Sequence, residues 1–291
     1  MNSTIFFRSL AAGLLLLSGS FVSCKKDLAG AIQNGVQSEA AVNAAAGITA
    51  IKSTWSVNWD NYAHGTTYTS SNAASDFGNV TGWNNSRAYI SNGNLRIQLN
   101  PNALSAAGGV VANIDVSDGS AYEMDYDIRF HSAFDWSRGG KVGFGFSIGD
   151  GNTGGDPAWD GNGGTLRLMW YRNDANRVYF QPYLYYKDQP GQYGDDFGKT
   201  YPASGSIQRG TTYHVHLYIK SNSGSSTNGH VQIVINNTVL LDRDIRWTTN
   251  DSKRLIRGVT FHTFRGGSQS YWESSTVGYI YYDNLSIHKI N

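Results

Sequence analysis

Hydrophobic and polar residues alternate with a period of two over much of the chain beyond residue 50. Apolar residues occupy every second position in 95–99 and in 122–128, and charged or amide side chains stand between them. Since successive side chains of a β-strand point to opposite faces, this alternation predicts strands with one buried and one polar face. Further strand-like runs occur at 142–148, 166–170, 178–186, 212–220, 230–241, 255–264 and 277–288.

These runs are separated by Gly, Asn, Asp and Ser, the residues that favour turns. We find no convincing helix in this part of the chain, and no internal repeat of the kind that marks propellers or solenoids. The pattern therefore predicts an all-β protein. The expected architecture is a jelly-roll β-sandwich, concanavalin-like, made of two antiparallel sheets.

The composition agrees with short strands joined by tight turns. The 291 residues include 34 glycines, only 5 prolines and 13% aromatic residues. The formal net charge is +1 and no basic block is present, which argues against a nucleic-acid partner. The net charge is too small to attract a charged partner on its own, so binding must depend on a local site.

The first 24 residues form a segment of a different kind. Arg8 precedes a short apolar core that contains 14–17, and the only cysteine, Cys24, follows it. This order predicts an export signal over 1–24, whose apolar run is too short for a stable membrane span. The position of Cys24 resembles a bacterial lipobox and predicts its lipidation, while cleavage by an ordinary signal peptidase is the alternative. A single cysteine allows no intrachain disulfide.

Residues 25–50 are rich in Ala, Gly, Ser and Asn, and we interpret them as a flexible tether. One domain then covers 51–291. The expected location is the bacterial cell envelope, on the periplasmic or the outer face, with secretion as the alternative. The only expected membrane contact is the lipid anchor, and the expected oligomeric state is a monomer.

Strand parity collects polar and aromatic side chains on one face of two successive runs. This set comprises Thr165, Arg167, Tyr179, Gln181, Tyr183 and Tyr185. Tyrosine rings stack on the apolar faces of sugars, and polar side chains bind sugar hydroxyls. A sandwich with such a face is expected to bind a carbohydrate, although tyrosine is also common in strands for packing alone.

Two cations stand out near this face. Lys141 follows the pair Gly139 and Gly140, which allow close backbone approach, although a solvated lysine at a strand end is the ordinary explanation. Arg167 lies between apolar neighbours, where an unpaired charge is costly. A salt bridge to Asp125 or Asp127 would explain it structurally, and two-point binding of a carboxylate would explain it functionally.

Other chemistries have less support. His262 is the best histidine candidate for substrate binding, with a packed strand histidine as the alternative. No Gly-x-Ser-x-Gly elbow supports a serine hydrolase, and no cysteine or His-Glu-x-x-His cluster supports zinc. The alternating carboxylates of 123–127 can flank a glycosidic bond, or can belong to a charged edge strand. Loop 150–162 offers oxygen ligands for a structural calcium, but turn formation explains its composition as well. We therefore expect no cofactor and no metal.

Four segments, in the same order along the chain, resemble polysaccharide lyase family 14 and the related glucuronan lyases of family 20. They are 134–141 with Phe-Asp-Trp-x-x-Gly-Gly-Lys, 166–170 with Leu-Arg-Leu-Met-Trp, 261–268 with Phe-x-Thr-Phe-x-Gly-Gly-Ser, and 282–285 with Tyr-Asp-Asn-Leu. The resemblance implies a jelly-roll sandwich that cleaves uronate polymers, alginate or glucuronan, by β-elimination.

The resemblance also implies roles for individual residues. It assigns the catalytic residues to Lys141, Arg167 and Tyr179. The family carries a second tyrosine where this chain has Gln181, so either Gln181 binds the carboxylate or a small shift makes Tyr183 or Tyr185 that tyrosine. Thr165, Gln181, Tyr183, Tyr185 and His262 are the expected substrate-binding residues.

The chemistry of elimination suits these groups. The proton at C5 is poorly acidic until the neighbouring carboxylate is neutralised, a task for Arg167 with Gln181 or Thr165. Lys141 and Tyr179 would then share the proton transfers, with Lys141 also able to lower the pKa of the tyrosine by proximity. The alternatives are a non-catalytic carbohydrate-binding lipoprotein and a glycoside hydrolase on the same fold.

Overall fold

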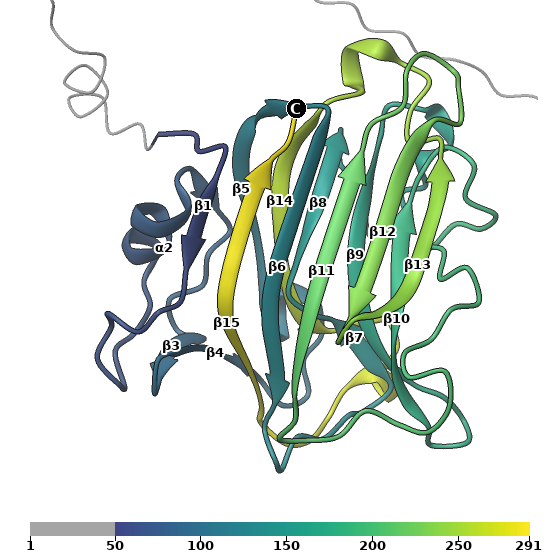
Figure 1. Cartoon of the computed structure of the whole chain (residues 1–291). Helices are drawn as coiled ribbons and strands as arrows, with labels where there is room; N and C mark the ends of the chain where they lie inside the picture. Colours follow the sequence, from purple (N-terminus) through teal and green to yellow (C-terminus); the bar gives the residue numbers. More distant parts are fainter. Residues whose placement is uncertain (1–49) are drawn as a thin grey trace, which may run out of the picture. The chain divides into compact units, whose positions relative to one another are not determined.

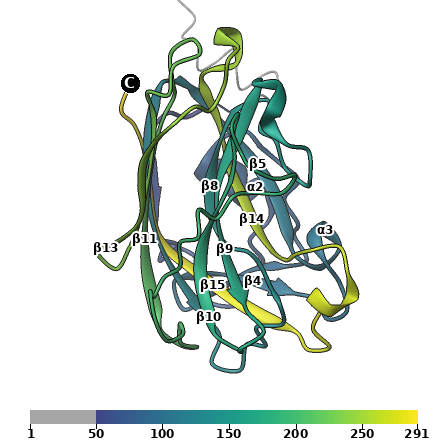
Figure 2. The same cartoon turned by 90° about the vertical axis from the view of Figure 1, so that its right-hand side faces the viewer.

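The computed structural model describes residues 50–291, and these form two antiparallel β-sheets packed face to face (Figures 1 and 2). One sheet has eight strands. These are β1 (Trp55–Val57), β3 (Ala88–Ser91), β4 (Asn94–Leu99), β6 (Ala121–Phe130), β11 (Thr212–Lys220), β12 (Gly229–Ile235), β13 (Thr238–Ile245) and β15 (Gly278–Lys289). Their order is β13-β12-β11-β6-β15-β4-β3, and β1 pairs with β15. This sheet lies in front in Figure 1.

The second sheet has seven strands. These are β2 (Val80–Thr81), β5 (Val110–Gly119), β7 (Gly139–Lys141), β8 (Phe144–Gly149), β9 (Gly163–Arg172), β10 (Val178–Tyr185) and β14 (Ile256–Arg265). The order is β10-β9-β7-β14-β5-β2, with β8 between β9 and β14 beyond the end of β7. The predicted all-β sandwich of two antiparallel sheets is confirmed.

The core lies between the two sheets, where the alternating apolar residues meet. Side chains of β6 that alternate with its charges, such as Met124 and Ile128, have no exposed surface. From the other sheet Phe146, Leu166 and Trp170 face them and are also buried. The period of two therefore identifies the inward face of these strands, because burial of one face is what the alternation reflects.

The prediction of a single strand over 230–241 is wrong. The chain turns at Asn236 and Asn237, whose φ angles are +47° and +62°, and continues as a separate strand, β13. Two successive residues in the left-handed region make the tight turn of a β-hairpin, and asparagine tolerates this conformation better than most residues. The Asn-Asn pair is the local signal for the break.

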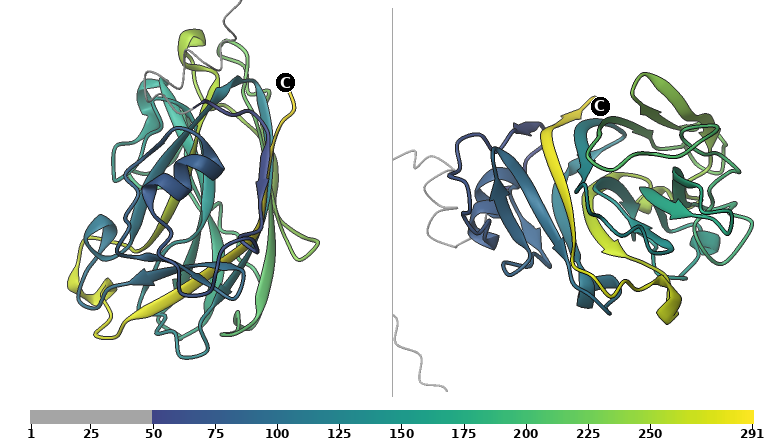
Figure 3. Two further views of the ribbon diagram at one scale, coloured as in Figure 1. Left: turned by 90° about the vertical axis from the view of Figure 1, so that its left-hand side faces the viewer. Right: turned by 90° about the horizontal axis from the view of Figure 1, so that it is seen from below.

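The expectation of no helix is also wrong. Helix α2 (Ser70–Phe77) covers one side of the sandwich (Figure 3). It begins with a capping box between Thr69 and Asn72 and buries only Ala73 and Phe77. With two buried residues in eight, the helix shows no apolar stripe, so its cap is the only usable sequence signal.

The remaining helical segments are single turns. They are α3 (Ser105–Gly108), η1 (Ala158–Asp160), η2 (Asp251–Lys253) and η3 (Ser270–Trp272). Among residues 50–291, no helix is long and apolar enough to cross a membrane. The predicted export signal at 1–24, its Cys24 and nearly all of the tether lie outside the described residues, so these assignments stay predictions.

Candidate active site

Two glycines bring Lys141 into the seven-stranded sheet. Strand β7 lies between β9 and β14, and a Cβ atom on Gly140 would stand 2.0 Å from the carbonyl oxygen of Phe264 and 2.3 Å from the Trp170 ring. Gly139 has a φ of +146°, which other residues rarely adopt. Only glycine fits at this close approach, which fixes the position of the lysine that follows.

The strand register then sets the neighbours of Lys141. Met169 on β9 pairs with Lys141 on one side and with Gln181 of β10 on the other. Two residues along the same face of β9, Arg167 pairs with Tyr183 of β10. These five side chains therefore lie on the face of the seven-stranded sheet that points away from the core.

Lys141 is a buried cation without a carboxylate partner. The residue is only 8% exposed, and its Nζ atom lies 3.6 Å from the centroid of the Tyr183 ring and 4.0 Å from the Met169 sulfur. Burial, together with the charge of Arg167, holds the pKa of Lys141 well below its ordinary value. A fraction of neutral amine is therefore available at lower pH than for a free lysine.

Arg167 is the second buried cation, at 4% exposure. Its Nη1 atom lies 3.4 Å from Nδ1 of His262, whereas Nε and Nη2 are buried without a hydrogen-bond partner. Burial lowers the pKa of Arg167. Within the described residues, the ion pairs of the protein include neither Lys141 nor Arg167. Two unpaired cations side by side are costly to bury and suit an anionic ligand.

The competing explanation for Arg167 is wrong. Asp125 and Asp127, its proposed partners, lie on β6 in the other sheet, where they bind His216 and His214 at 2.9 Å each. The same two carboxylates were the candidate pair for a glycoside hydrolase. They lie on the polar outer face of the other sheet, beside His214 and His216, and therefore do not belong to the site around Lys141.

His262 reaches the site from β14. Burial, and then the charges of Arg167 and Lys141, lower the pKa of His262 to about 3, so its imidazole is neutral at ordinary pH. The Nε2 atom is buried and has no partner within the protein. A neutral ring with one free nitrogen beside an arginine can hydrogen-bond a ligand carboxylate, as its predicted binding role requires.

Two of the predicted binding residues hold a loop. The Thr165 hydroxyl donates to the carbonyl oxygen of Asn152 at 2.9 Å, and the Tyr185 hydroxyl accepts from the amide of Gly155 at 3.0 Å. Both Thr165 and Tyr185 have no exposed surface. Loop 150–156 therefore crosses the sheet face one register row beyond Arg167, and it bounds the site on that side.

Tyr179 lies on the predicted face, but one register row beyond Gln181. It pairs with Tyr171, whose ring is 5.8 Å away, and the guanidinium of Arg177 lies 4.7 Å from its ring centroid. Burial raises the pKa of Tyr179, so the lowering by Lys141 that the sequence allowed does not occur. The structure instead brings Tyr183 against Lys141.

The pKa of Tyr183 is also raised, chiefly by burial and then by the neighbouring Tyr185. The phenol therefore stays protonated over the whole useful pH range. This makes Tyr183 a hydrogen-bond or proton donor, and a poor base.

Met169 is the site residue that sequence reasoning misses. Parity places it beside Arg167, but a thioether carries no acid or base and gives no sign of a role. Its sulfur lies 4.0 Å from Nζ of Lys141 and 3.7 Å from the amide nitrogen of Gln181. Met169 thus lies between the two polar groups and contacts both.

The aspartates of the loop considered for calcium are engaged within the protein. Asp150 pairs with Lys253 at 2.5 Å, and Asp156 accepts from the amide of Asn152 at 3.2 Å. In residues 50–291, no cluster of three or more metal-ligating His, Cys, Asp or Glu side chains is found. The expectation that the protein needs no cofactor stays a prediction.

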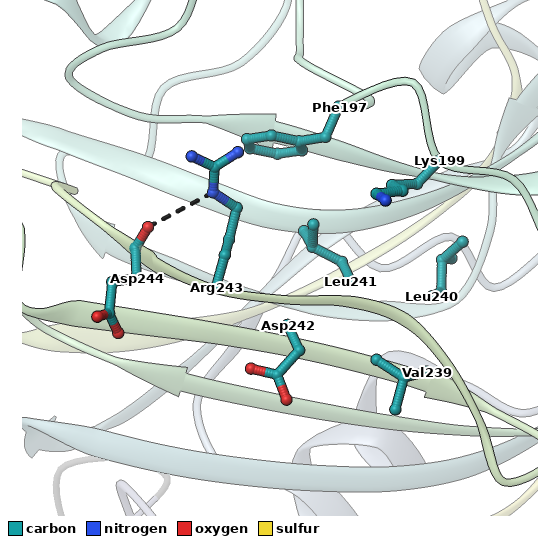
Figure 4. Close-up of a pocket in the computed structure, with 8 residues that line it drawn as sticks. All are labelled: Phe197, Lys199, Val239, Leu240, Leu241, Asp242, Arg243 and Asp244. Atoms are coloured by element: carbon teal, nitrogen blue, oxygen red, sulfur yellow. Dashed lines mark hydrogen bonds between the residues drawn. The ribbon is translucent and has the colours of Figure 1, made fainter.

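A cavity of about 450 Å³ lies elsewhere, beside β13, and is shown in Figure 4. It is lined by Phe197, Lys199 and 239–244. The guanidinium of Arg243 stacks over the Phe197 ring at 4.7 Å. None of the lining residues belongs to the cluster around Lys141, so the volume of this cavity does not identify it as the reacting centre.

Comparison with known proteins identifies the family to which this fold and site correspond. The family model for polysaccharide lyase 14 matches residues 106–285. Alginate lyase Aly36B is 71% identical over 83% of this chain and 99% of its own, with a TM-score of 0.82. A search of curated proteins finds no match.

Two further structures share the fold at low identity. The PL-14 alginate lyase from Aplysia kurodai is 21% identical over 82% of this chain and 99% of its own, with a TM-score of 0.65. The alginate lyase vAL-1 from Chlorella virus is 20% identical over 72% of this chain and 88% of its own, with a TM-score of 0.53. The sandwich is thus a shared scaffold.

Proposed function

The chain belongs to polysaccharide lyase family 14 and is a lyase, and we propose that it cleaves alginate by β-elimination. The observation that carries this proposal is the pair of buried cations, Lys141 and Arg167, which have no carboxylate partner among the described residues. A uronate carboxylate supplies the missing anion. A neutral sugar would leave both charges uncompensated.

Neutralisation of that carboxylate is the first requirement of the reaction. We assign it to Arg167, whose unpartnered Nε and Nη2 atoms can form a two-point contact with a carboxylate. His262 stands beside Arg167 with a free Nε2 atom and can donate a further hydrogen bond in its neutral form. Withdrawal of charge from the carboxylate makes the proton at C5 more acidic and stabilises the enolate-like intermediate.

We assign abstraction of the C5 proton to Lys141. Its lowered pKa provides the neutral amine that a base requires, and its burial among Tyr183 and Met169 keeps the amine from being solvated. The bond between C4 and the leaving oxygen then breaks as the double bond between C4 and C5 forms. The leaving oxygen must receive a proton.

We assign donation of that proton to Tyr183. Its raised pKa keeps the phenol protonated, and the contact of its ring with Nζ of Lys141 places acid and base next to each other. The position of Tyr179, two rows from Tyr183 along the face, favours a role in binding for that residue. Gln181 offers an amide beside Met169 for hydrogen bonds to the sugar.

Two complexes of the relative Aly36B support alginate as the substrate, and a lysine, a tyrosine and a methionine as residues of the site. Aly36B has been solved with an alginate tetrasaccharide as a mutant in which a lysine and a tyrosine are replaced by alanine. A second complex, with an alginate trisaccharide, is a mutant in which a lysine and a methionine are replaced by alanine. In this chain Lys141 contacts a tyrosine, Tyr183, and a methionine, Met169.

The proposal is tested by incubating the purified chain with alginate, glucuronan and a neutral polysaccharide. Elimination creates a carbon-carbon double bond in the product, so ultraviolet absorbance should rise with alginate and stay flat with the neutral polymer. A rise in absorbance with glucuronan alone would show that glucuronan, and not alginate, is the substrate. Binding without any rise in absorbance would favour a carbohydrate-binding protein, and new reducing ends without absorbance would favour a hydrolase.

The tyrosine assignment makes a separate prediction. Tyr183→Phe should reduce kcat on alginate by about a hundredfold or more, because the leaving oxygen loses its proton donor. Tyr179→Phe is the matched control, with the same chemical change two rows away, and we expect kcat to change by less than about threefold. Initial rates at saturating alginate provide the measurement. The reverse order of effects would restore Tyr179 as the proton-transfer residue, and full activity of both variants would leave both proton transfers to Lys141.

Export, lipidation of Cys24 and a monomeric state also belong to the proposal. Export and lipidation rest on the sequence pattern at 1–24 alone. The mass of the mature protein from cell envelopes would show a lipid on Cys24, and light scattering would give the oligomeric state.

A further inference from the structure

The eight-stranded sheet carries a regular row of tyrosines and arginines on its outer face. Tyr89 of β3 pairs with Arg96 of β4, Arg96 pairs with Tyr281 of β15, and Tyr281 pairs with Arg129 of β6. The four residues therefore stand side by side across four adjacent strands, in the order Tyr, Arg, Tyr, Arg. We call this set the tyrosine-arginine row. It lies on the opposite sheet from Lys141.

The rings hold the two guanidinium groups in place. Arg96 lies over the Tyr89 ring at 5.2 Å and over the ring of Tyr279, the residue two before Tyr281, at 4.9 Å. Arg129 lies over the Tyr281 ring at 4.3 Å. Such stacking orders a side chain that is otherwise flexible, and thereby lowers the entropy that binding would cost.

Neither arginine is engaged by a carboxylate. Among residues 50–291 the ion pairs of the protein leave out both Arg96 and Arg129. Arg96 has a buried Nε without a partner, and Arg129 donates from Nη2 to the side-chain oxygen of Asn94 at 3.1 Å. Both side chains remain partly exposed. Their charges are available to an external anion.

The groups around the row define its limits. On one side, the next register row contains Asp283 opposite Asp127, and Asn94 stands between Arg129 and Asp283, donating to the latter at 3.2 Å. On the other side lies His131, whose ring stacks on Tyr281 at 6.2 Å. The carboxylates of Asp283 and Asp127 would repel an anionic chain, so they limit the row on that side.

We propose that the tyrosine-arginine row is a second, non-catalytic binding surface for an extended polyuronate chain. The identity of the polymer rests on the proposed function. Arg96 and Arg129 are two strands apart, about 10 Å, so they can bind carboxylates of alternate sugars in one chain. The partly exposed rings of Tyr89 and Tyr279 offer apolar surface for the sugar faces.

This surface holds polymer at the enzyme without taking part in the chemistry. A long chain bound at the row keeps its other segments at high local concentration near the active site. A tetrasaccharide gains nothing, because it is too short to occupy both sheets. The row therefore improves cleavage of polymer at low concentration and leaves cleavage of short substrates unchanged.

The test uses the full chain carrying Lys141→Ala, which cannot cleave its ligand, with alginate tetrasaccharide added to saturate the active site. Retention of the protein by immobilised alginate then reports the second surface. Adding Arg96→Gln and Arg129→Gln together should weaken retention by about tenfold, because each partly exposed ion pair with the polymer contributes only modestly. Thermal unfolding of each variant shows that the fold is intact.

The matched control is Arg243→Gln with Arg257→Gln, which removes the same charge from other surface positions. Equal retention of the row variant and its parent would overturn the proposal. Equal losses in the row variant and the control variant would also overturn it, since net charge would then explain the binding. Retention lost by the row variant alone supports it.

Activity separates this proposal from the proposed function. In the chain with Lys141 intact, the row variant should keep its kcat/KM on tetrasaccharide and lose several-fold in kcat/KM on polymer at low concentration. Cleavage of alginate without any effect of the row would remove the second surface and keep the lyase assignment. Retention that depends on the row, without cleavage of any uronate polymer, would keep the second binding surface and remove the lyase assignment.

Discussion

Lys141→Met is expected to abolish elimination, with a loss in kcat of about a thousandfold or more. The change removes the only amine among the groups that the structure brings together at the site, and methionine fills the same volume without a base. Neighbouring groups cannot replace it, because burial keeps Tyr183 protonated and lowers the pKa of His262 to about 3. The rise of ultraviolet absorbance on saturating alginate measures the loss.

Lys199→Met is the control, since Lys199 is exposed and lines the cavity beside β13. It should keep the activity of the parent. A Lys141→Met variant that retained more than about a tenth of the parental kcat would show that another group removes the C5 proton.

The same substitution has a signed effect on stability. Because the pKa of Lys141 is lowered in the folded state, the unfolded chain binds the proton more tightly, and folding is opposed at pH values below the ordinary lysine pKa. This cost shrinks as pH rises through the window between the folded and the unfolded pKa. Lys141→Met should therefore raise the unfolding temperature, and more at mildly acidic pH than at alkaline pH. An equal rise at both would contradict the lowered pKa.

Arg167→Gln is expected to reduce kcat on alginate by about a hundredfold to a thousandfold. The guanidinium neutralises the uronate carboxylate most fully when the C5 proton has left, so its removal weakens the intermediate more than the bound substrate. Arg167→Lys should restore little of this, because an ammonium group cannot make the planar two-point contact. The rate at saturating substrate measures the loss of stabilisation of the intermediate, and the apparent binding constant measures the loss of substrate binding.

The pH profile gives an independent measure of the same arginine. Its charge contributes to lowering the pKa of both Lys141 and His262. In Arg167→Gln the pKa of Lys141 should move up. The rise of the residual activity with pH should therefore occur at higher pH than in the parent. Arg257→Gln, an exposed arginine on the outer surface, should shift neither rate nor profile. An unchanged profile in Arg167→Gln would show that Arg167 does not act on the base.

The fold class and the chemistry of the site are readable from the sequence for a local reason. A period of two in strands is a property of the backbone at each residue, so the alternation alone places Met124, Ile128 and Leu166 inward. The same period puts Arg167 on an outward face. The glycine pair before Lys141 signals a close approach of backbones, and the structure confirms the space restriction.

Other features escape sequence reasoning because their signals are short or non-local. Helix α2 has too few buried residues to show a helical period, and the Asn236-Asn237 turn divides a run that is largely apolar. The proposed salt bridge from Arg167 to Asp125 or Asp127 is wrong, because charge alone does not say which sheet a strand joins.

The choice between Tyr179 and Tyr183 shows where sequence information ends for this protein. By itself the sequence determined the residue types, their alternation and the face that each side chain occupies. Only the tertiary structure decided which of the two tyrosines meets Lys141, since that depends on the insertion of β7 between β9 and β14 and on the register of each pair. Strand pairing is fixed by packing between residues distant in the chain, and no local pattern contains it.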